Sequence, residues 1–549
     1  MLSYRKLAMR VLGRPLHTEG IDSPRPASQR AAALVLTAAM LTTLAAPAFA
    51  DIWRIENGDI TISAGESGND VTQNNVTTKN DTNTIITNQK TDIASSNTVT
   101  IDAGNDKVEV TLDNVNIEAN SGPALTSKGD VTLTLKGENH LTGGNGGRYG
   151  GSGITSNGSL TITGGENDSL TAQGGSSADG GSGSYGGDGI GSSSGGLTIS
   201  GGTVNAAGGS GSYGGSGIYS RGGLTISGGT VTANGGGDGS NVRSGSGITS
   251  NGGVTISGGT VNAAGGSGSY GGNGIYSRSS LTISGGTVNA TGRDGKDGYG
   301  GGGIWSGSGG LTISGGTVTA NGGNGGSGSY GGDGIGSIGG VAISGGTVTA
   351  NGGNGGNGGD GICSSGIDLS GSLELTAKAG SPSGRVLSQN GDELDLNTIK
   401  DKLGPGAKVT TTDANGKVNQ VSIPRPVESE KPVIPEESSS SSDGGSATPS
   451  APASPLPGLT VTDKDGQRIS YTSTQSGNTL TVCVGRFTAS FRISLAALRQ
   501  LRAEGIETIT FQTILCSTTL SVDELLAMGG EDAEAVLTHR LTDSSLTVG

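Results

Sequence analysis

The sequence predicts an all-β fold, a right-handed, single-stranded parallel β-helix (solenoid), followed by a disordered Pro/Ser linker and a small α+β domain. Three observations support this prediction. A short apolar phrase recurs along the chain, its register survives changes in loop length, and glycine supplies 110 of the 549 residues while aromatic residues make up only 3%. A core of large side chains is therefore not expected, whereas a solenoid needs only a few small apolar residues in each turn.

The repeat carries most of this prediction. The phrase Leu-Thr-Ile-Ser-Gly-Gly-Thr-Val recurs with small variations, beginning at Leu160, Leu197, Leu224, Val254, Leu281, Leu311 and Val341. A second phrase, Gly-x-Gly-Ile, lies six or seven residues before each copy, with isoleucine at positions 154, 190, 218, 248, 275, 304 and 335, and once more at 362. Because length varies only in the glycine-rich loops, the apolar residues keep the register that stacked coils require.

A single repeat shows how one coil is expected to form. Leu224, Ile226 and Val231 belong to short runs of period two, so one side of each run is apolar. The glycines at 228–229 mark a tight corner between the two runs, and Ile218 marks a third strand. Each strand is expected to pair with its copy in the next coil, and parallel crossovers of this kind are right-handed in nearly all cases.

The segments on either side of the repeats divide the chain further. The predicted divisions are a signal peptide at 1–50, an N-terminal cap with the first coils at 51–143, glycine-rich coils at 144–366, final coils with a C-terminal cap at 367–423, a Pro/Ser/Glu-rich linker at 424–458, and a small α+β domain at 459–549. In the second of these, Leu133 lies 27 residues before Leu160, which suggests one further coil at the same spacing.

The first fifty residues predict export. Basic residues are followed by a charge-free apolar stretch, Ala31–Ala50, which ends in Ala-Pro-Ala-Phe-Ala, a cleavage pattern of small residues. An uncleaved membrane anchor is the alternative, since about twenty apolar residues can span a bilayer. The expected location is secreted or cell surface, with no membrane attachment after cleavage.

The C-terminal domain shows ordinary strand and helix signals. Strands are expected at 480–484, 487–493 and 506–516, and Ser494 and Ser521 are expected to cap two helices, 27 residues apart. Cys483 and Cys516 both fall in predicted strands, where they form either a disulfide or two buried thiols.

The net charge of −14 argues against nucleic acid as a partner, because phosphates require a basic face, and permits cations or neutral glycans. The motifs Asn97-Thr-Val-Thr-Ile-Asp102, Val108 to Ile117, Val131 to Gly137 and the Ile-Ser-Gly-Gly-Thr-Val repeats resemble a family of secreted carbohydrate-binding (pectin-binding-like) β-helix proteins of Gram-positive bacteria. The resemblance covers residues 51 to about 380. It implies a polysaccharide partner, an acidic plant polymer such as pectin, and calcium ions on the helix.

An enzyme is the main alternative, because polysaccharide lyases and hydrolases also use this scaffold. Residues 141–365 contain only fifteen charged side chains, and no cluster for acid–base chemistry emerges from their spacing. Arg221 and Arg278 occupy equivalent places two coils apart, which fits solvated corner residues as well as a site. The sequence therefore favours a non-catalytic protein, with a purely structural surface spacer as a third alternative.

Calcium remains open on the sequence alone. Oxygen ligands occur in the loop Asn351–Gly361, and the position two before the isoleucine holds Asp188, Asp333 or Asp360 in some coils. Other coils have serine, asparagine or glycine there, which does not match a calcium-binding repeat with an aspartate in each turn.

The candidate carbohydrate-binding residues are six tyrosines, each five residues before the isoleucine of its coil, with Arg243 and Asn357 in that place in two other coils. They are Tyr149, Tyr185, Tyr213, Tyr270, Tyr299 and Tyr330. Stacked coils would align them in a column with about 5 Å between neighbours, and aromatic rings are common sugar-binding surfaces. The alternative is that the rings only stack on one another and shield the glycine loops. Tyr219, Tyr276 and Trp305 form a second, sparser set.

Overall fold

The computed structural model describes residues 52–177, 183–237, 243–424 and 458–548, the last range with short gaps at 464–465, 470, 477, 485, 487, 514–516, 529–532 and 540–543. The predicted signal peptide and nearly all of the predicted linker lie outside the described residues. Two compact units divide between Ser429 and Glu430. Within the described ranges, no helix combines the length and the apolar character needed to cross a membrane.

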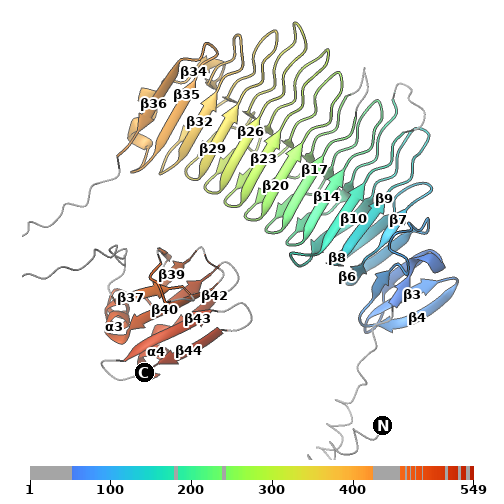
Figure 1. The fold of residues 1–549 in the computed structure, drawn as a ribbon, viewed down its shortest axis with the longest axis horizontal. Coiled ribbons are helices and arrows are strands. Elements are labelled where there is room, and N and C mark those ends of the chain that lie inside the picture. Colours follow the sequence, from blue (N-terminus) through green and yellow to red (C-terminus); the bar gives the residue numbers. More distant parts are fainter. Residues whose placement is uncertain are drawn as a thin grey trace, which may run out of the picture. The chain divides into compact units, whose positions relative to one another are not determined.

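The first unit is a parallel β-solenoid of about 14 turns (Figure 1). It begins with a cap of short elements, in which β3 pairs antiparallel with both β2 and β4. The cap contains β1 (Ile52–Arg54), η1 (Ile55–Asn57), β2 (Ile60–Ala64), β3 (Asn69–Gln73), β4 (Val76–Asp81) and β5 (Ile85–Thr87). Antiparallel strands at this end cover the open edge that a bare coil would present to other chains.

Three ladders of parallel strands run along the solenoid. The isoleucine ladder and the leucine ladder begin as the long strands β6 (Val99–Asp113), β8 (Leu125–Lys136) and β10 (Ile154–Thr163). The isoleucine ladder continues as β12 (Ile190–Ser194), β15 (Ile218–Ser220), β18 (Ile248–Ser250), β21 (Ile275–Ser277), β24 (Ile304–Ser306), β27 (Ile335–Ser337), β30 (Ile362–Ser364) and β33 (Leu387–Gln389). The leucine ladder continues as β13 (Leu197–Ile199), β16 (Leu224–Ile226), β19 (Val254–Ile256), β22 (Leu281–Ile283), β25 (Leu311–Ile313), β28 (Val341–Ile343) and β31 (Ile367–Leu369).

The valine ladder is a twelve-stranded sheet that ends in an antiparallel strand, β36. Its strands are β7 (Asn116–Glu118), β9 (Glu138–Thr142), β11 (Ser169–Gln173), β14 (Thr203–Ala207), β17 (Thr230–Asn234), β20 (Thr260–Ala264), β23 (Thr287–Thr291), β26 (Thr317–Asn321), β29 (Thr347–Asn351), β32 (Glu374–Lys378), β35 (Lys408–Thr412) and β36 (Val418–Ser422). The short strand β34 (Asp392–Glu393) and the 3-10 helix η2 (Leu396–Lys402) complete the C-terminal end.

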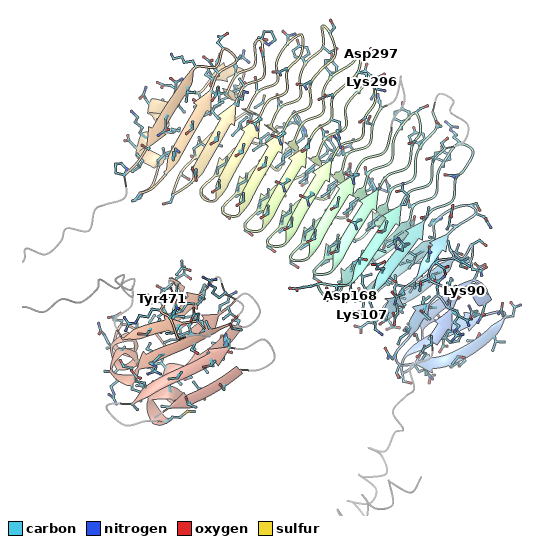
Figure 2. The ribbon with its side chains drawn as sticks, viewed as in Figure 1. Lys90, Lys107, Asp168, Lys296, Asp297 and Tyr471 are labelled. Carbon is cyan, nitrogen blue, oxygen red and sulfur yellow. The ribbon has the colours of Figure 1, made fainter. Side chains whose placement is uncertain are left out.

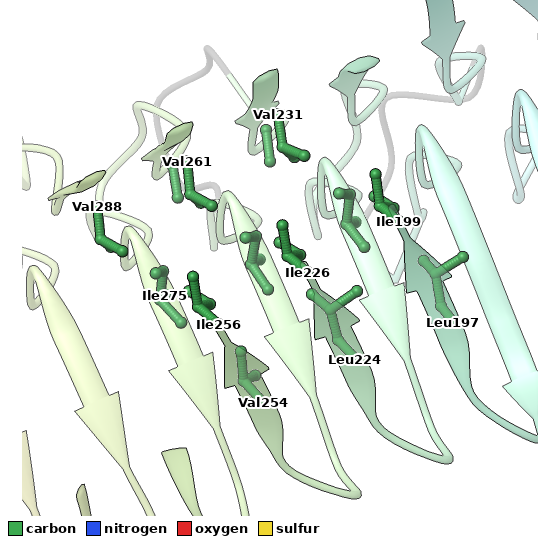
Figure 3. Close-up of a cluster of buried hydrophobic side chains, with 14 of the residues drawn as sticks. Leu197, Ile199, Leu224, Ile226, Val231, Val254, Ile256, Val261, Ile275 and Val288 are labelled. Atoms are coloured by element: carbon green, nitrogen blue, oxygen red, sulfur yellow. The ribbon is translucent and has the colours of Figure 1, made fainter. Parts of the chain in front are cut away.

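The predicted register is confirmed. Ile218 pairs with Ile248, Leu224 with Val254, and Val231 with Val261, so each apolar residue lies beside its copy in the next coil. These side chains fill the interior and are at most 2% exposed (Figure 3). Burying one such side chain stabilises the fold by about 1.5–3 kcal/mol, so a few per coil suffice.

One inferred equivalence is wrong. Leu160 pairs with Val131, and Leu133 pairs with Ile162. The coil spacing here is therefore two residues longer than the 27 residues inferred from the sequence. A shift of two residues keeps both side chains on the inner side, because side chains alternate with a period of two.

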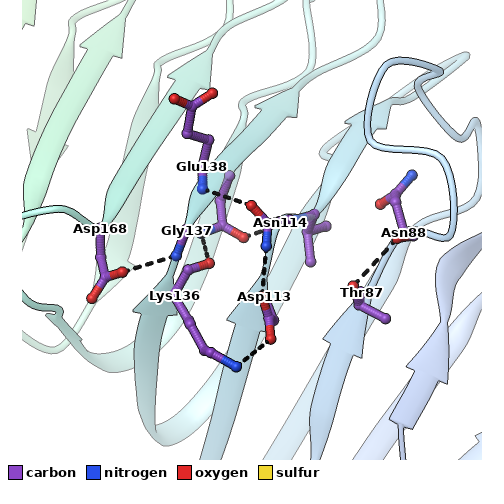
Figure 4. Close-up of polar contacts among 10 residues, drawn as sticks. Thr87, Asn88, Asp113, Asn114, Lys136, Gly137, Glu138 and Asp168 are labelled. Carbon is purple, nitrogen blue, oxygen red and sulfur yellow. Dashed lines mark hydrogen bonds and ion pairs between the residues drawn. The ribbon is translucent and has the colours of Figure 1, made fainter.

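Polar side chains fix the outer corners of neighbouring coils. Lys136 forms an ion pair with Asp113 of the preceding coil at 2.7 Å, and the carboxylate of Asp168 accepts a hydrogen bond from the backbone N–H of Gly137 at 2.8 Å (Figure 4). Glu138 donates its N–H to the side-chain oxygen of Asn114 at 3.1 Å. Because the side chains of Asp168 and Asn114 reach from one coil to the next, they accept hydrogen bonds from the backbone N–H groups of Gly137 and Glu138.

A buried serine column was missed in the sequence. A serine follows each isoleucine by two residues and points inward, at most 5% exposed, at Ser156, Ser192, Ser220, Ser250, Ser277, Ser306, Ser337 and Ser364. In several coils its hydroxyl donates to the carbonyl at the next corner, as Ser250 does to Gly253 at 2.7 Å and Ser277 does to Ser280 at 2.8 Å. The signal was present in the recurring Ile-x-Ser pattern.

The second unit is the predicted α+β domain. Its two four-stranded sheets are β37-β40-β43-β44 and β38-β39-β41-β42. The strands are β37 (Leu459–Thr462), β38 (Thr472–Ser476), β39 (Thr479–Cys483), β40 (Ala489–Ser494), β41 (Thr508–Gln512), β42 (Ser517–Ser521), β43 (Glu534–His539) and β44 (Ser544–Val548).

Both helices of this unit follow a capping serine, as expected. The hydroxyl of Ser494 accepts from the N–H of Ala497 at the start of α3 (Leu495–Ala503), and Ser521 accepts from Glu524 at the start of α4 (Val522–Met528). The thiol of Cys483 lies 3.3 Å from the side-chain oxygen of Gln512. Cys483 is a free, half-buried thiol, so the predicted alternative of a disulfide with Cys516 is wrong in this structure, and Cys516 itself lies outside the described residues.

Replacing Ser250 with alanine is expected to remove a buried hydrogen bond to the Gly253 carbonyl, which keeps only its bond from the backbone N–H of Leu224. The expected loss is about 1–2 kcal/mol, measured as a lower urea midpoint for the solenoid. Ser257→Ala, at an exposed outer position, is the matched control and should leave the midpoint unchanged. Equal midpoints for the two variants would contradict the role of the serine column.

His539 makes the stability of the second unit depend on pH. Its ring is fully buried against Phe491, its Nε2 lies 3.0 Å from the Thr518 hydroxyl, and its Nδ1 has no hydrogen-bond partner among the described residues. Burial lowers the pKa of His539 below its usual value.

The unfolded chain therefore binds more protons than the folded unit in this range, and stability should fall as pH drops below about 6.5. Hydrogen exchange of residues 458–548 should show faster opening at pH 5 than at pH 7. The variant His539→Gln should flatten this dependence, and a slope that persists in the variant would assign the effect to other groups.

Candidate functional site

The six candidate tyrosines form one continuous column. Isolated parallel bridges join Tyr149 to Tyr185, Tyr185 to Tyr213, Tyr213 to Arg243, Arg243 to Tyr270, and Tyr330 to Asn357. Ring contacts join Tyr270 to Tyr299 and Tyr299 to Tyr330. The alignment predicted from the sequence is therefore correct, including the two coils in which arginine and asparagine replace tyrosine.

Arg243 divides the column into two triads with different geometry. In the first triad (Tyr149, Tyr185, Tyr213) the rings stack with centroids 5.5 and 4.7 Å apart and planes 12° apart. In the second triad (Tyr270, Tyr299, Tyr330) the centroids are 6.0 and 5.7 Å apart, and the planes are tilted by 45° and 41°.

In each triad an arginine lies against the ring of the first tyrosine in the sequence. The guanidinium carbon of Arg148 is 5.6 Å from the ring centre of Tyr149, and that of Arg243 is 5.8 Å from the ring centre of Tyr270. At these distances a cation is attracted to the negative face of the ring. No salt bridge to a described carboxylate involves either arginine, so each keeps its charge available beside the column.

The orientation of the tyrosine rings determines which of their atoms a ligand can contact. Stacking within the first triad uses the ring faces, as the alternative interpretation of the sequence supposed. The rings are nevertheless 39–62% exposed, and within the described residues the structure gives no hydrogen-bond partner to any of their six hydroxyls. The column therefore presents ring edges and a row of hydroxyls, and not a flat aromatic platform.

Glycine positions the column. The backbone at Tyr185 donates to the Arg148 carbonyl at 2.8 Å, and Gly186 donates to the Tyr213 carbonyl at 2.9 Å, so the loops are hydrogen-bonded from coil to coil. A Cβ atom on Gly186 would lie 1.9 Å from the carbonyl oxygen of Gly209. The coils approach so closely here that only glycine fits, and this fixes the tyrosine backbone.

Charged residues are found at the tips of the same loops. Figure 2 labels Lys296 and Asp297 at the tip of one glycine-rich loop, and Tyr299 follows two residues later in the sequence. The neighbouring carboxylate of Asp294 accepts a hydrogen bond from the N–H of Asn324 in the next coil. These side chains therefore belong to the edge that carries the tyrosine column.

The second aromatic set lies on the outer side of the isoleucine ladder. The amide of Asn251 donates to the Tyr219 hydroxyl at 3.0 Å. Trp305 pairs in register with Gly336, where a Cβ atom would lie 2.2 Å from the indole ring. Gly336 therefore makes room for the ring of Trp305, a role that the sequence pattern did not reveal.

Each acidic residue considered for calcium has one side-chain oxygen bonded to a backbone group. Oδ1 of Asp188 accepts from the N–H of Ser216 at 2.7 Å, Oδ1 of Asp333 from Asp360 at 2.8 Å, and Oδ1 of Asp360 from Arg385 at 2.7 Å. In the loop Asn351–Gly361, Oδ1 of Asn354 accepts from Ser381 at 2.8 Å. Across the part of the chain that the structure describes, no three or more His, Cys, Asp or Glu side chains form a metal-binding group.

Two of these carboxylates are strongly perturbed. Burial raises the pKa of Asp188 to about 7 and that of Asp333 to about 7, although each residue keeps some accessible surface. Burial together with the nearby charges of Asp333 and Asp360 raises the pKa of Cys363 to about 12, so this thiol is not a nucleophile. The sequence already places Asp333 and Asp360 at the same position of two consecutive coils, and the structure shows that the N–H of Asp360 donates to the carboxylate of Asp333.

The arginines considered for catalysis do not join a site. Arg221 and Arg278 are exposed at corners, where their backbone N–H groups donate to the carbonyls of Ser192 and Ser250. Neither side chain forms a salt bridge with a described carboxylate. Their equivalent positions follow from the repeat itself.

With the fold and the column in place, the chain can be compared with known proteins. No protein-family model, curated protein or solved structure matches it. The assignment of the first unit as a parallel β-solenoid therefore rests on its own strand pairing. Its resemblance to secreted carbohydrate-binding β-helix proteins stays a prediction.

The buried carboxylates predict an unusual dependence of solenoid stability on pH. The pKa of Asp333 is about 7 in the folded chain and near 3.9 in an unfolded one. The folded state therefore binds more protons between these values, so stability should be complete below pH 4 and should decline as pH rises through 7.

The variant Asp333→Asn should raise the urea midpoint of the solenoid at pH 8 and have little effect at pH 4. Asp297→Asn, at an exposed loop tip, is the control and should change neither midpoint. A lower midpoint for Asp333→Asn at pH 8 would show that the carboxylate stabilises the coil as a charged group.

Proposed function

We propose that this chain is a non-catalytic, extracellular carbohydrate-binding or adhesive protein that holds a polysaccharide or cell-surface glycan along its tyrosine column. The observation that carries this proposal is the column itself, in which six exposed tyrosines recur one coil apart within each triad, with Arg243 between the triads. Neighbouring coils are about 4.8 Å apart, which is similar to the length of one sugar unit in an extended glycan. Successive sugars can thus meet successive rings in equivalent ways.

The chemistry of the column suits hydroxyl-rich ligands. Its phenolic hydroxyls, which have no hydrogen-bond partner among the described residues, can donate and accept hydrogen bonds, and its ring edges offer apolar contact at little cost in conformational entropy. Arg148 and Arg243 add two cations that form no salt bridge with a described carboxylate. The column can therefore bind neutral sugars, and it can also place a uronate carboxylate between the triads, as the resemblance to pectin-binding-like proteins implies.

The proposed location comes from the sequence. The basic start, the apolar stretch and the small-residue cleavage pattern of residues 1–50 support export, and export would bring the column to glycans outside the cell. The resemblance to secreted carbohydrate-binding β-helix proteins of Gram-positive bacteria supports the same location.

One observation favours a second candidate, a polysaccharide hydrolase. Glycoside hydrolysis uses two carboxyl groups, one of which is protonated at neutral pH. Asp333 and Asp360 lie in neighbouring coils, and Asp333 has a pKa of about 7. Against this candidate, one oxygen of each carboxylate is held by a backbone N–H, which restricts movement toward a substrate.

The test is binding of the full chain to arrays of plant and mucin polysaccharides, with assays for new reducing ends and unsaturated products. The variant Tyr185→Leu/Tyr213→Leu/Tyr270→Leu/Tyr299→Leu should bind at least about tenfold more weakly, because one ring contact contributes roughly 1 kcal/mol. The control Tyr219→Leu/Tyr276→Leu removes tyrosines outside the column and should bind normally.

Two outcomes would overturn the proposal. Unchanged affinity in the fourfold variant would exclude the column as the binding surface. Product formation that is lost in Asp333→Asn would establish the hydrolase instead.

A further inference from the structure

A pocket lies at the C-terminal end of the leucine ladder, far along the sequence from most of the tyrosine column. Its volume is about 570 Å³. Its floor is the outer side of β25, β28 and β31, and one wall is the 3-10 helix η2, which folds back beside these strands. A volume of this size is typical of small-molecule sites.

The repeat changes at this pocket. The outward residue of the leucine ladder is threonine in six consecutive coils, from Thr161 through Thr312, and then becomes Ala342 and Asp368. Both replacements line the pocket. Ala342 has neither the hydroxyl nor the extra methyl group of threonine, so its coil leaves space where the preceding coils do not.

A third change lies at the rim. Ile338 directly precedes two lining glycines, Gly339 and Gly340, and it is 61% exposed, although it is a large apolar residue. Equivalent corner positions in other coils hold polar or small residues such as Arg221 and Asn251. An exposed isoleucine beside a pocket suggests a contact surface.

The wall of the pocket is held in place by its own contacts. The carboxylate of Glu393 accepts hydrogen bonds from the N–H groups of Val386 and Leu387, both at 2.9 Å. The N–H of Leu394 donates to the carbonyl of Leu387 at 2.8 Å. The segment leading into η2 is therefore fixed to the last strand of the isoleucine ladder.

The lining combines an apolar surface with hydrogen-bonding groups. Ala342, Leu394 and Ile399 supply the apolar part. Asp368 and Lys402 form an ion pair of 2.9 Å across the pocket, and their side chains remain 56% and 57% exposed. Because these two charges offset one another, the pocket favours an uncharged ligand that can both donate and accept hydrogen bonds.

We propose that this pocket binds a single neutral sugar unit, either free or at the end of a glycan chain. A pyranose ring has an apolar C–H face, which would pack over Ala342 and Leu394. Its hydroxyls would bond to the Asp368 carboxylate and the Lys402 ammonium group. Gln389, whose side-chain oxygen accepts from the N–H of Ile367 at 3.0 Å, still has its NH₂ group to donate. This site does not depend on the tyrosine column.

The test uses the full chain and a panel of D-glucose, D-galactose, D-mannose, D-xylose, cellobiose and lactose, measured by saturation-transfer NMR and calorimetry. At least one of these sugars is expected to bind. The variant Ala342→Thr restores the residue of the preceding coils, so it should fold normally, fill the floor and weaken binding at least about tenfold. Lys402→Gln should weaken it as well, since it breaks the ion pair.

The matched control is Ala264→Thr on the valine ladder, where the next coil already has Thr291 in register. This control and the fourfold tyrosine variant should both bind the small sugars normally, which separates the pocket from the column. A second experiment tests whether the pocket binds chain ends, by comparing how well a polysaccharide and its short oligosaccharides, at equal sugar mass, compete with the bound small sugar. Stronger competition by the oligosaccharides supports binding of chain ends. Competition by free sugars alone supports binding of free sugars. Absence of binding across the panel, or normal binding by Ala342→Thr, would overturn the proposal.

Discussion

The structure depends on one constraint, which is that neighbouring coils stay one strand spacing apart over almost the whole circuit, loops included. In the strands this spacing is maintained by parallel hydrogen bonding and by identical apolar residues lying on one another, such as Ile218 on Ile248. In the loops it is maintained by glycine. A Cβ atom on Gly215 would lie 2.0 Å from the carbonyl oxygen of Gly187. The high glycine content is therefore a packing requirement of closely stacked loops.

This constraint turns any residue that recurs in the repeat into a column. Inward serines become a buried column that bonds corner carbonyls, outward tyrosines become a row of ring edges, and loop aspartates and asparagines become acceptors for the next coil. The same residue types in a globular fold would be scattered. Here the surroundings of a residue are made by the equivalent residues of the neighbouring coils. For example, Asp333 accepts a hydrogen bond from the N–H of Asp360 in the next coil, and Asp360 accepts one from the N–H of Arg385.

Departures from the repeat are consequently the informative positions. Arg243 interrupts the tyrosines and places a cation between two triads with different ring geometry. Ala342 and Asp368 interrupt the threonines and coincide with a pocket beneath the terminal 3-10 helix. Threonine fits the same outward position in the preceding coils, so the packing of the solenoid does not require Ala342 or Asp368 there.

The sequence alone determined the solenoid, the strand register, the alignment of all six tyrosines and the capped helices of the C-terminal domain. Each of these follows from a local pattern repeated at a spacing that only stacked coils satisfy. Tertiary structure decided what no spacing encodes. Leu160 lies beside Val131, the rings of Tyr185 and Tyr213 stack face to face, and Oδ1 of Asp188 and Oδ1 of Asn354 each accept a backbone hydrogen bond. Tertiary structure also decided that η2 forms one wall of the pocket that Ala342 lines. These features depend on side-chain direction and on contacts between distant segments, and a one-dimensional pattern contains neither.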